Sequence, residues 1–216
     1  MQIYQDFSDE VPRFFADKYS RDASRYWDKF YCRNGSNFFK DRHYLEDEFP
    51  QLNEIADILL EVGCGAGNTL YPLLERRPGL KMYACDFSAR AIELVKEHPE
   101  YDPAKITAFV ADVTQDRPFD SYLSPGSVDL VTMIFVLSAV SPENLTKAVG
   151  NVSRVLKDGG LVLFRDYASG DLAQLRLAGE GKQRRVGDNC YVRGDGTLAC
   201  YFDPDSLANI FAEHGM

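Results

Sequence analysis

The sequence of 216 residues lacks long apolar runs, cysteine pairs at metal-binding spacing and neighbouring histidines. No segment approaches the roughly 18 apolar residues that a membrane helix needs, so no membrane span is expected. The five cysteines contain no C-x-x-C pair, which predicts reduced thiols rather than a disulfide framework or a zinc site. The three histidines are far apart, and no metal site is expected. Because the N-terminus has no basic-then-apolar signal peptide, we expect a cytoplasmic protein, with the nucleus or mitochondrion left open.

Positive charge is also scarce. The formal net charge of −9 argues against a surface that binds nucleic acid without specificity. Two segments differ, because residues 13–42 carry a net +4 and residues 173–193 a net +3, which leaves −16 for the remainder. This pattern fits either an acidic body that grips nucleic acid at one face, or two solvated loops. The 45% hydrophobic content is sufficient for one globular domain with a proper core.

The most informative stretch is Asp57–Asn68, in which apolar residues run into an acid and glycine then occupies every second position. Residues 58–62 are typical of a buried parallel strand. The glycines predict a tight strand-to-helix turn that a ligand approaches closely, since a residue without a Cβ allows that approach. A helix beginning near Gly67 would point its free N–H groups at the same place.

This turn has three possible interpretations. A dinucleotide site requires G-x-G-x-x-G, but Asn68 stands where the third glycine should be. Glu61 precedes the turn, and a carboxylate there suits a cationic amine better than a pyrophosphate. The pattern Glu-x-Gly-x-Gly-x-Gly resembles the first motif of class I methyltransferases that use S-adenosylmethionine. A plain βα turn with glycines for packing is the remaining alternative.

Strand and helix patterns alternate five times, which predicts a doubly wound α/β fold with a mostly parallel sheet. We expect an N-terminal aromatic and basic helical cap over residues 1–45, frayed at 1–12, and the sheet domain over 46–216. Residues 168–188 are expected to be mostly irregular, and a hairpin insertion is expected at about 188–203. The expected strands cover residues 58–62, 81–85, 105–111, 128–137 and 161–164, and the helix before the last strand should end at the glycines of 157–160.

Polar residues follow several of these strands, at the edge where ligands bind in such sheets. Asp86 is placed to accept hydrogen bonds from ribose hydroxyls, or else caps the next helix. Asp112 could accept the adenine amino group, and the end of the fourth strand at Ile134 and Phe135 should line the site. Trp27 and Tyr31, four residues apart, share a helix face and form either an aromatic lid over the ligand or ordinary core packing.

Several longer motifs point to one family: Phe38–His43, Cys85–Ser88, Ile134–Ala139, Phe164–Tyr167 and Tyr191–Thr197. They resemble the methyltransferase-like tRNA N(3)-methylcytidine methyltransferases over about residues 24–215. The resemblance implies the class I, Rossmann-like methyltransferase fold with S-adenosylmethionine as cofactor. It also implies methyl transfer to N3 of a cytidine in the tRNA anticodon loop, at nucleotide 32. A small-molecule methyltransferase and a non-catalytic cofactor-binding subunit remain open.

The motifs and the resemblance together give the candidate site residues, and no metal ligands. Asp166 should stabilise the positive charge of the methylated base, and Arg165 should hold a phosphate or orient Asp166. The candidate cofactor residues are Trp27, Tyr31, Glu61, Gly63, Gly65, Asp86, Phe87, Asp112 and Ile134. The candidate substrate residues are Phe39, Lys40, Arg42, His43, Tyr167, Arg184, Arg185 and Arg193.

Two further expectations come from the resemblance. Residues 91–95 and 101–103 look most like the branch that acts on threonine and arginine tRNAs, and in some relatives an aminoacyl-tRNA synthetase assists. Family members continue with two more strands that finish the sheet, whereas this sequence ends at Met216. We therefore expect the fifth strand to be an exposed edge.

Overall fold

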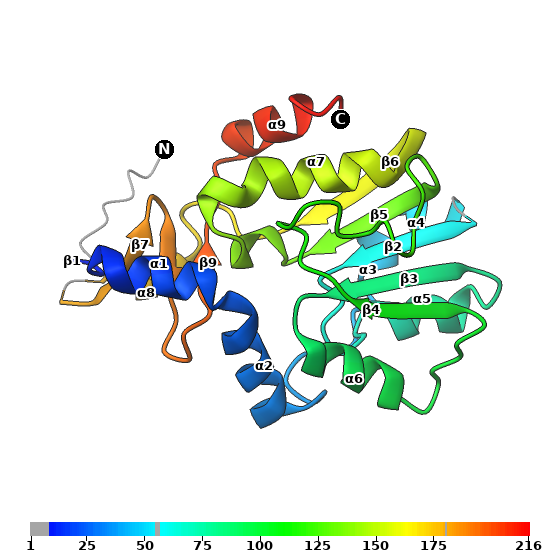
Figure 1. Ribbon diagram of the computed structural model, residues 1–216, viewed down its shortest axis with the longest axis horizontal. Helices are drawn as coiled ribbons and strands as arrows, with labels where there is room; N and C mark the ends of the chain where they lie inside the picture. The colour runs from blue at the N-terminus through cyan, green and yellow to red at the C-terminus, as the bar shows by residue number, and fades with distance from the viewer. Residues whose placement is uncertain (1–8, 55–56, 180) are drawn as a thin grey trace.

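The computed structural model describes residues 9–54, 57–179 and 181–216. Its larger part is a five-stranded parallel sheet in the order β4-β3-β2-β5-β6. The chain builds outward from β2, first on one side and then on the other, so the order reverses between β2 and β5. This doubly wound α/β sheet confirms the predicted fold class (Figure 1). Its strands are β2 (Ile58–Val62), β3 (Lys81–Asp86), β4 (Ile106–Val110), β5 (Val128–Ile134) and β6 (Leu156–Arg165).

Helices cover both faces of this sheet (Figure 1). Successive residues of β2 point to opposite faces, so Leu59 and Leu60 enter two different hydrophobic clusters. The cluster around Leu59 includes α5 (Leu70–Arg76) and α6 (Ala89–Glu97), and the cluster around Leu60 includes α7 (Leu145–Val155) and α9 (Pro204–Ala212). The buried face of α7 has helical spacing: Leu145, Ala148, Val149, Val152 and Val155.

Two predicted boundaries are wrong. The glycines at 157–160 do not cap a helix, because α7 ends at Val155 and these residues begin β6. A Cβ on Gly160 would lie 3.0 Å from the Asp129 carbonyl oxygen of β5, so glycine is needed for strand packing. The fourth strand ends at Ile134 rather than residue 137, because Phe135 has a positive φ of 59° and a 3₁₀ turn, η1 (Leu137–Ala139), follows.

Side chains cap two helix N-termini, as Ser and Asp commonly do. The Ser88 hydroxyl accepts a hydrogen bond from the Ala91 N–H at 3.1 Å and begins α6. Asp203 does the same for α9 through the Ser206 N–H at 2.9 Å. Before α7, the proline at 142 opens a 3₁₀ turn, η2 (Pro142–Asn144), as its fixed φ favours.

A second sheet lies beside the first, in the order β1-β7-β8-β9. It consists of β1 (Asp9–Glu10), β7 (Gln183–Gly187), β8 (Cys190–Val192) and β9 (Leu198–Cys200), with α8 (Leu172–Leu177) next to it in sequence. The predicted hairpin is the β8–β9 pair, but the irregular segment predicted for 168–188 contains α8 and β7. Fraying was wrong for Asp9–Glu10, which pair in parallel with β7; residues 1–8 lie outside the described residues.

The second sheet also corrects a prediction about the cysteines. Cys190 and Cys200 face each other across β8 and β9 and are joined by a disulfide. The expectation of reduced thiols was therefore wrong for this pair, because sheet register brings together residues that no short motif links. Cys32, Cys64 and Cys85 carry free thiols.

The N-terminal cap contains α1 (Arg13–Arg21) and α2 (Ala23–Asn34), and α3 (Leu45–Glu48) and α4 (Gln51–Glu54) follow before β2. The helical part of the cap is interrupted at Asp22, between α1 and α2. In Figure 1, α1 lies beside the small sheet and α2 descends toward α6. The Asp28 carboxylate fastens α2 to α6, since one oxygen accepts hydrogen bonds from the Ser88 hydroxyl at 2.6 Å and the Arg90 N–H at 3.1 Å.

Within the described residues, β6 pairs only with β5 and forms one edge of the large sheet, as expected. A groove runs along this edge between β6 and α9, lined by apolar side chains that include Phe164, Leu207 and Phe211. No helix in the described ranges is long and apolar enough to cross a bilayer.

The attachment of α2 gives a first prediction. Asp28→Ala removes two hydrogen bonds, and it should lower the free energy of unfolding by about 1–2 kcal/mol and expose residues 13–34 to proteolysis. Thermal melting and limited proteolysis measure both effects. Asp17→Ala, an exposed acid on α1, is the matched control. Equal melting temperatures and cleavage patterns for the two variants would contradict this role.

Candidate active site

The glycine turn after β2 brings backbone very close to two neighbouring side chains. Gly63 and Gly65 have positive φ angles of 66° and 54°, in the region that glycine occupies without strain. A Cβ on Gly63 would lie 2.5 Å from a methyl carbon of Val136, and one on Gly65 would lie 2.6 Å from the Tyr31 hydroxyl. Glycine is therefore required at both positions for conformation and for space.

A cavity opens above this turn, at the carboxyl ends of the strands. Its wall combines residues of the cap, the turn, the ends of β3 and β4, and the segment after β5. Six predicted cofactor residues line it: Trp27, Tyr31, Gly63, Asp86, Phe87 and Asp112. The structure thus brings together residues separated by up to 85 positions in the sequence. We refer to this space as the first cavity.

Asp86 is the buried anchor of the first cavity. One carboxylate oxygen accepts a hydrogen bond from the Gly65 N–H at 3.0 Å, and the other accepts from the Ser88 N–H at 2.9 Å. Burial raises the pKa of this carboxyl to about 6, although both hydrogen bonds oppose the rise. The side chain therefore ties the glycine turn to the beginning of α6, and it retains acceptor capacity for ribose hydroxyls.

Glu61 lies under the turn with 1% of its surface exposed. Neither of its carboxylate oxygens has a hydrogen-bond partner within the described structure. Burial raises its pKa to about 7, and the nearby Arg42 guanidinium opposes that rise. An orphaned acid beneath a glycine cradle suits a ligand that carries positive charge and comes close to backbone. These residues therefore fit S-adenosylmethionine, and they do not suit a pyrophosphate.

A second cavity adjoins the first and is strongly aromatic. Both are lined by Trp27, Tyr31, Gly63 and Phe135. The other rings of the second cavity are Phe30, Phe38, Phe39, Tyr44 and Tyr167. Its polar lining includes Lys40, Arg42, Asn68, Ser138, Arg193, Asp195 and Thr197, and Gly65 and Ile134 lie here rather than in the first cavity.

The segment that supplies Phe39, Lys40 and Arg42 is fastened to the exit of the glycine turn. The Asn68 side chain donates to the Phe39 carbonyl at 3.1 Å, and the Arg42 N–H donates to the Asn68 carbonyl at 2.8 Å. Arg42 itself donates to the Thr69 hydroxyl at 3.1 Å. These contacts hold the predicted substrate residues over the second cavity, whereas His43 is exposed and outside its lining.

Phe135 lines both cavities, as predicted for the end of the fourth strand. Its backbone has the left-handed φ noted above, which is costly for a residue with a large side chain. Its ring lies 5.8 Å from the Arg42 guanidinium, 5.9 Å from that of Arg165 and 5.0 Å from the Tyr167 ring. The strained backbone thus places one ring at the boundary of both cavities, and nothing in an apolar strand pattern signals such a conformation.

Asp166 and Arg165, the predicted catalytic pair, line the groove beside β6 instead of the two cavities. The Asp166 carboxylate accepts hydrogen bonds from the N–H groups of Ser138 and Tyr167, each at 2.9 Å. Burial raises its pKa. Arg165 pairs with Glu48. Asp166 therefore lies one layer behind Ser138 and can act on the second cavity by fixing its wall.

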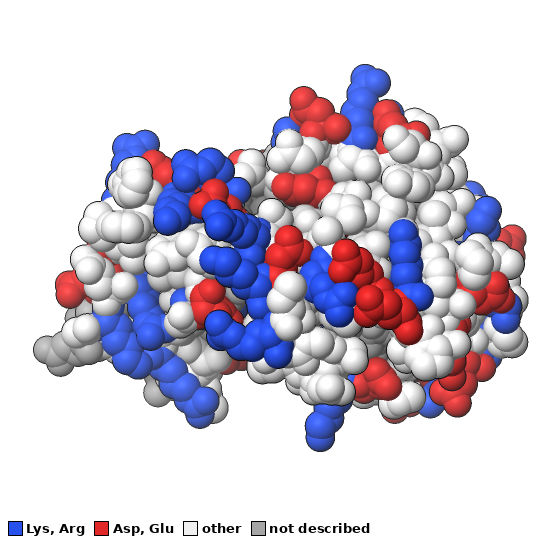
Figure 2. Space-filling model, turned by 60° about the horizontal axis from the view of Figure 1, so that its bottom comes forward, with Lys and Arg blue, Asp and Glu red and all other residues white. Residues whose placement is uncertain are grey.

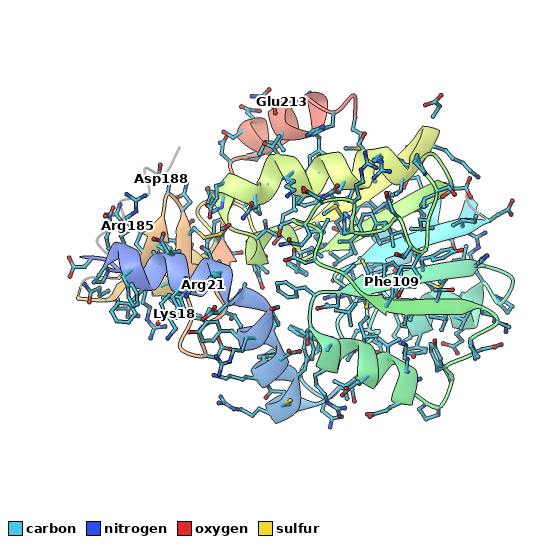
Figure 3. All side chains as sticks on the ribbon, viewed as in Figure 1. Lys18, Arg21, Phe109, Arg185, Asp188 and Glu213 are labelled. Carbon is cyan, nitrogen blue, oxygen red and sulfur yellow. A yellow bond between two sulfur atoms is a disulfide. The ribbon has the colours of Figure 1, made fainter. Side chains whose placement is uncertain are left out.

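Arg184 and Arg185 lie in β7 of the small sheet and line neither cavity. Arg185 pairs with Glu10 at 3.3 Å. Figure 2 shows Lys and Arg side chains gathered over the part of the molecule that carries α1, α2 and the small sheet, with more Asp and Glu over the large sheet. Figure 3 shows Lys18, Arg21 and Arg185 on this same side.

The described residues contain no group of three or more His, Cys, Asp or Glu side chains placed to hold a metal ion. The two cavities instead offer carboxylates, rings and guanidinium groups.

Comparison with solved structures supports the fold. A methyltransferase from Leishmania major described as S-adenosylmethionine-dependent has a TM-score of 0.63 at 14% identity, covering 100% of this chain and 88% of that one. A phosphoethanolamine N-methyltransferase from Haemonchus contortus, solved with S-adenosylmethionine, has a TM-score of 0.58 at 19% identity, covering 95% of this chain and 44% of that one. These similarities support the class I methyltransferase fold.

Sequence comparison is more specific. A methyltransferase domain model matches residues 60–162. The human tRNA N(3)-cytidine methyltransferase METTL6 is 46% identical, covering 95% of this chain and 73% of its own length. The fission yeast tRNA N(3)-methylcytidine methyltransferase trm141 is 43% identical, covering 90% of this chain and 80% of its own length. The chain therefore belongs to the tRNA N(3)-cytidine methyltransferase family.

Proposed function

We propose that this protein transfers a methyl group from S-adenosylmethionine to N3 of a cytidine in tRNA. The observation that carries the proposal is the pair of adjoining cavities that meet at Gly63 and Phe135. The first cavity has the carboxylates of Asp86 and Asp112 beside Gly63, as a nucleoside with ribose hydroxyls and an adenine amine requires. The other has the rings and basic groups that an unstacked nucleotide requires.

When bound, S-adenosylmethionine supplies an electrophilic methyl group, to which the N3 lone pair bonds while the electron pair of the broken C–S bond returns to sulfur. Neutral cytosine needs no prior deprotonation at N3, so a general base has no task here. The work of the protein is alignment of the acceptor atom with the methyl group. The base becomes cationic during transfer, and the protein must stabilise that charge.

The aromatic rings of the second cavity serve both purposes. A base can stack on Phe135, Tyr167 or Phe39, and their π faces attract the cationic product. Trp27 and Tyr31 form the partition between the cavities on the cap side. We assign Asp166 to positioning, through its hydrogen bond to the Ser138 N–H.

The finer substrate assignment extends this proposal. We propose that the target is a cytidine of the anticodon loop, because unstacking a base costs less in a loop. The resemblance of residues 91–95 and 101–103 favours threonine or arginine tRNA. An acidic body with two basic segments would hold the rest of a tRNA weakly, so a tRNA-binding helper such as an aminoacyl-tRNA synthetase would assist. The reaction would take place in the cytoplasm. A small-molecule methyltransferase would not need the basic side shown in Figure 2.

The direct test is methylation of total unmodified tRNA, followed by nucleoside mass spectrometry. We expect 3-methylcytidine to form only when S-adenosylmethionine and the chain are both present. Methylation of small amines without any tRNA product would favour the small-molecule alternative. Cofactor binding without any methyl transfer would favour a non-catalytic subunit.

The pKa values of Glu61 and Asp86 predict how cofactor binding depends on pH. Both carboxylates favour a cationic ligand only when ionised, so affinity should be highest above about pH 7. It should fall as protons bind to Glu61 near pH 7 and to Asp86 near pH 6. Calorimetry at constant ionic strength measures this profile.

Two variants show which carboxyl group causes each fall in affinity. Glu61→Gln should remove the upper step, and Asp86→Ala should abolish binding while the circular dichroism spectrum stays native. Unchanged affinity in Asp86→Ala, or binding of NAD in place of S-adenosylmethionine, would contradict the cofactor assignment.

The charge distribution predicts weak, salt-sensitive tRNA binding by the isolated chain. Phosphate contacts release counterions, so affinity should fall steeply with salt. Reversing Arg184 and Arg185 to Glu should weaken binding at low salt and leave cofactor affinity unchanged. Lys96→Glu, on the exposed side of α6, is the control. Tight binding at physiological salt that the reversals do not affect would contradict the charge argument.

A further inference from the structure

Asp195 is the one carboxylate that lines the second cavity among the residues described. It lies in the turn between β8 and β9, close to Arg193 and Thr197, which line the cavity as well. From the motif Tyr191–Thr197 only Arg193 is predicted to contact substrate, and Asp166 is predicted to be the acid beside the base. The structure places a different carboxylate in that position.

The turn that carries Asp195 is held firmly. One Asp195 oxygen, Oδ1, accepts hydrogen bonds from the Thr197 N–H at 3.0 Å and the Thr197 hydroxyl at 2.8 Å. Gly196 has a φ of 90°, and a Cβ there would lie 2.3 Å from the Tyr26 ring of α2. The turn therefore packs directly against the cap, and the Asp195 backbone has a fixed position relative to the cavity.

The other oxygen of Asp195, Oδ2, accepts no hydrogen bond from the residues that the structure describes. The neighbouring guanidinium of Arg193 is directed elsewhere, because it donates to the Leu198 carbonyl at 2.8 Å and lies 5.8 Å from the Tyr167 ring. Thr197 thus fixes Oδ1 of Asp195, and Oδ2 can accept a hydrogen bond from a ligand.

We propose, building on the function proposed above, that Asp195 recognises the exocyclic amine of the target cytosine and so selects cytidine over uridine. An ionised carboxylate only accepts hydrogen bonds. Cytosine presents the N4 amine as a donor beside the N3 lone pair, whereas uracil presents a carbonyl oxygen at that position. A carboxylate near N4 therefore attracts cytosine and repels uracil.

The same contact contributes to the reaction. As N3 gains the methyl group, positive charge spreads over the ring and onto the exocyclic nitrogen, so a hydrogen bond from that amine to a carboxylate strengthens in the transition state. Asp195 adds negative charge in a cavity that otherwise contains Lys40, Arg42 and Arg193. Arg42, which Thr69 holds on the sheet side, remains available to donate to O2 of the base.

The test compares two substrates that differ only in the exocyclic amine. The methylated cytidine of a tRNA is first located by mass spectrometry. The tRNA is then assembled by ligation with either cytidine or the 4-deamino analogue, 2-pyrimidinone, at that nucleotide. Asp195 is exposed in the structure, and the bound nucleotide would cover it. The wild-type protein should then prefer cytidine by about 100-fold or more in kcat/KM, because the analogue leaves a covered carboxylate unpaired.

Three variants separate recognition from structure. Asp195→Asn can still accept the Thr197 hydrogen bonds, and it should lose most activity on cytidine and reduce the preference to less than about tenfold. Asp166→Asn, which acts through Ser138, should slow both substrates by the same factor and keep the preference. Asp188→Asn, an exposed acid in the β7–β8 turn outside the cavity, should match the wild type.

The outcomes are distinguishable. Absence of 3-methylcytidine with any tRNA would overturn the proposed function itself. Methylation of both substrates at similar rates by the wild type would overturn only the role of Asp195, and this comparison needs no variant to fold. An Asp195→Asn protein that binds S-adenosylmethionine normally and keeps the full preference for cytidine would overturn it too.

Discussion

The structure depends on a short relay of hydrogen bonds that begins at the Asp86 carboxylate. That carboxylate accepts hydrogen bonds from the Gly65 N–H, in the glycine turn after β2, and from the N–H of Ser88, the N-cap residue of α6. The hydroxyl of Ser88 then donates to Asp28 of α2. Three segments from different parts of the sequence are thereby held at one point, and two acids are placed close together in a buried region. Burial raises the pKa of Asp86, and the nearby Asp28 carboxylate adds to that rise.

Much of the large sheet and the first cavity could be predicted from the sequence. Parallel strands have strongly apolar patterns, and the residues after them necessarily meet at one edge. Asp86, Phe87 and Asp112 were identified by this rule alone or with the family motifs, and they line one cavity with Gly63. The positions of Trp27 and Tyr31 over the turn follow from the helical spacing of two rings, once the helix is docked.

What could not be predicted depends on tertiary geometry. The left-handed backbone of Phe135 follows an apolar run that continues in the sequence, so periodicity extended the strand too far. The rule that favoured Asp166 placed it correctly at a strand end, but that end turns its carboxylate toward Ser138. Asp195 lies on a turn whose position is set by packing against Tyr26, a contact between residues distant in the sequence. The small sheet was missed in part because β1 and β7 are short and polar.

The pairing of β1 with β7 has a consequence for the order in which the protein is made. Asp9 pairs in register with Gln183, and its N–H donates to the Lys182 carbonyl at 3.1 Å. The first described strand therefore emerges from the ribosome long before its partner exists. The five strands of the large sheet end at Arg165, and domains commonly fold as units during synthesis. The large sheet, with α2 docked on α6, can therefore fold before β1 pairs with β7. The cavity for the base closes last, when the β8–β9 turn reaches α2, which leaves a nascent chain able to bind a methyl donor before it can admit an acceptor.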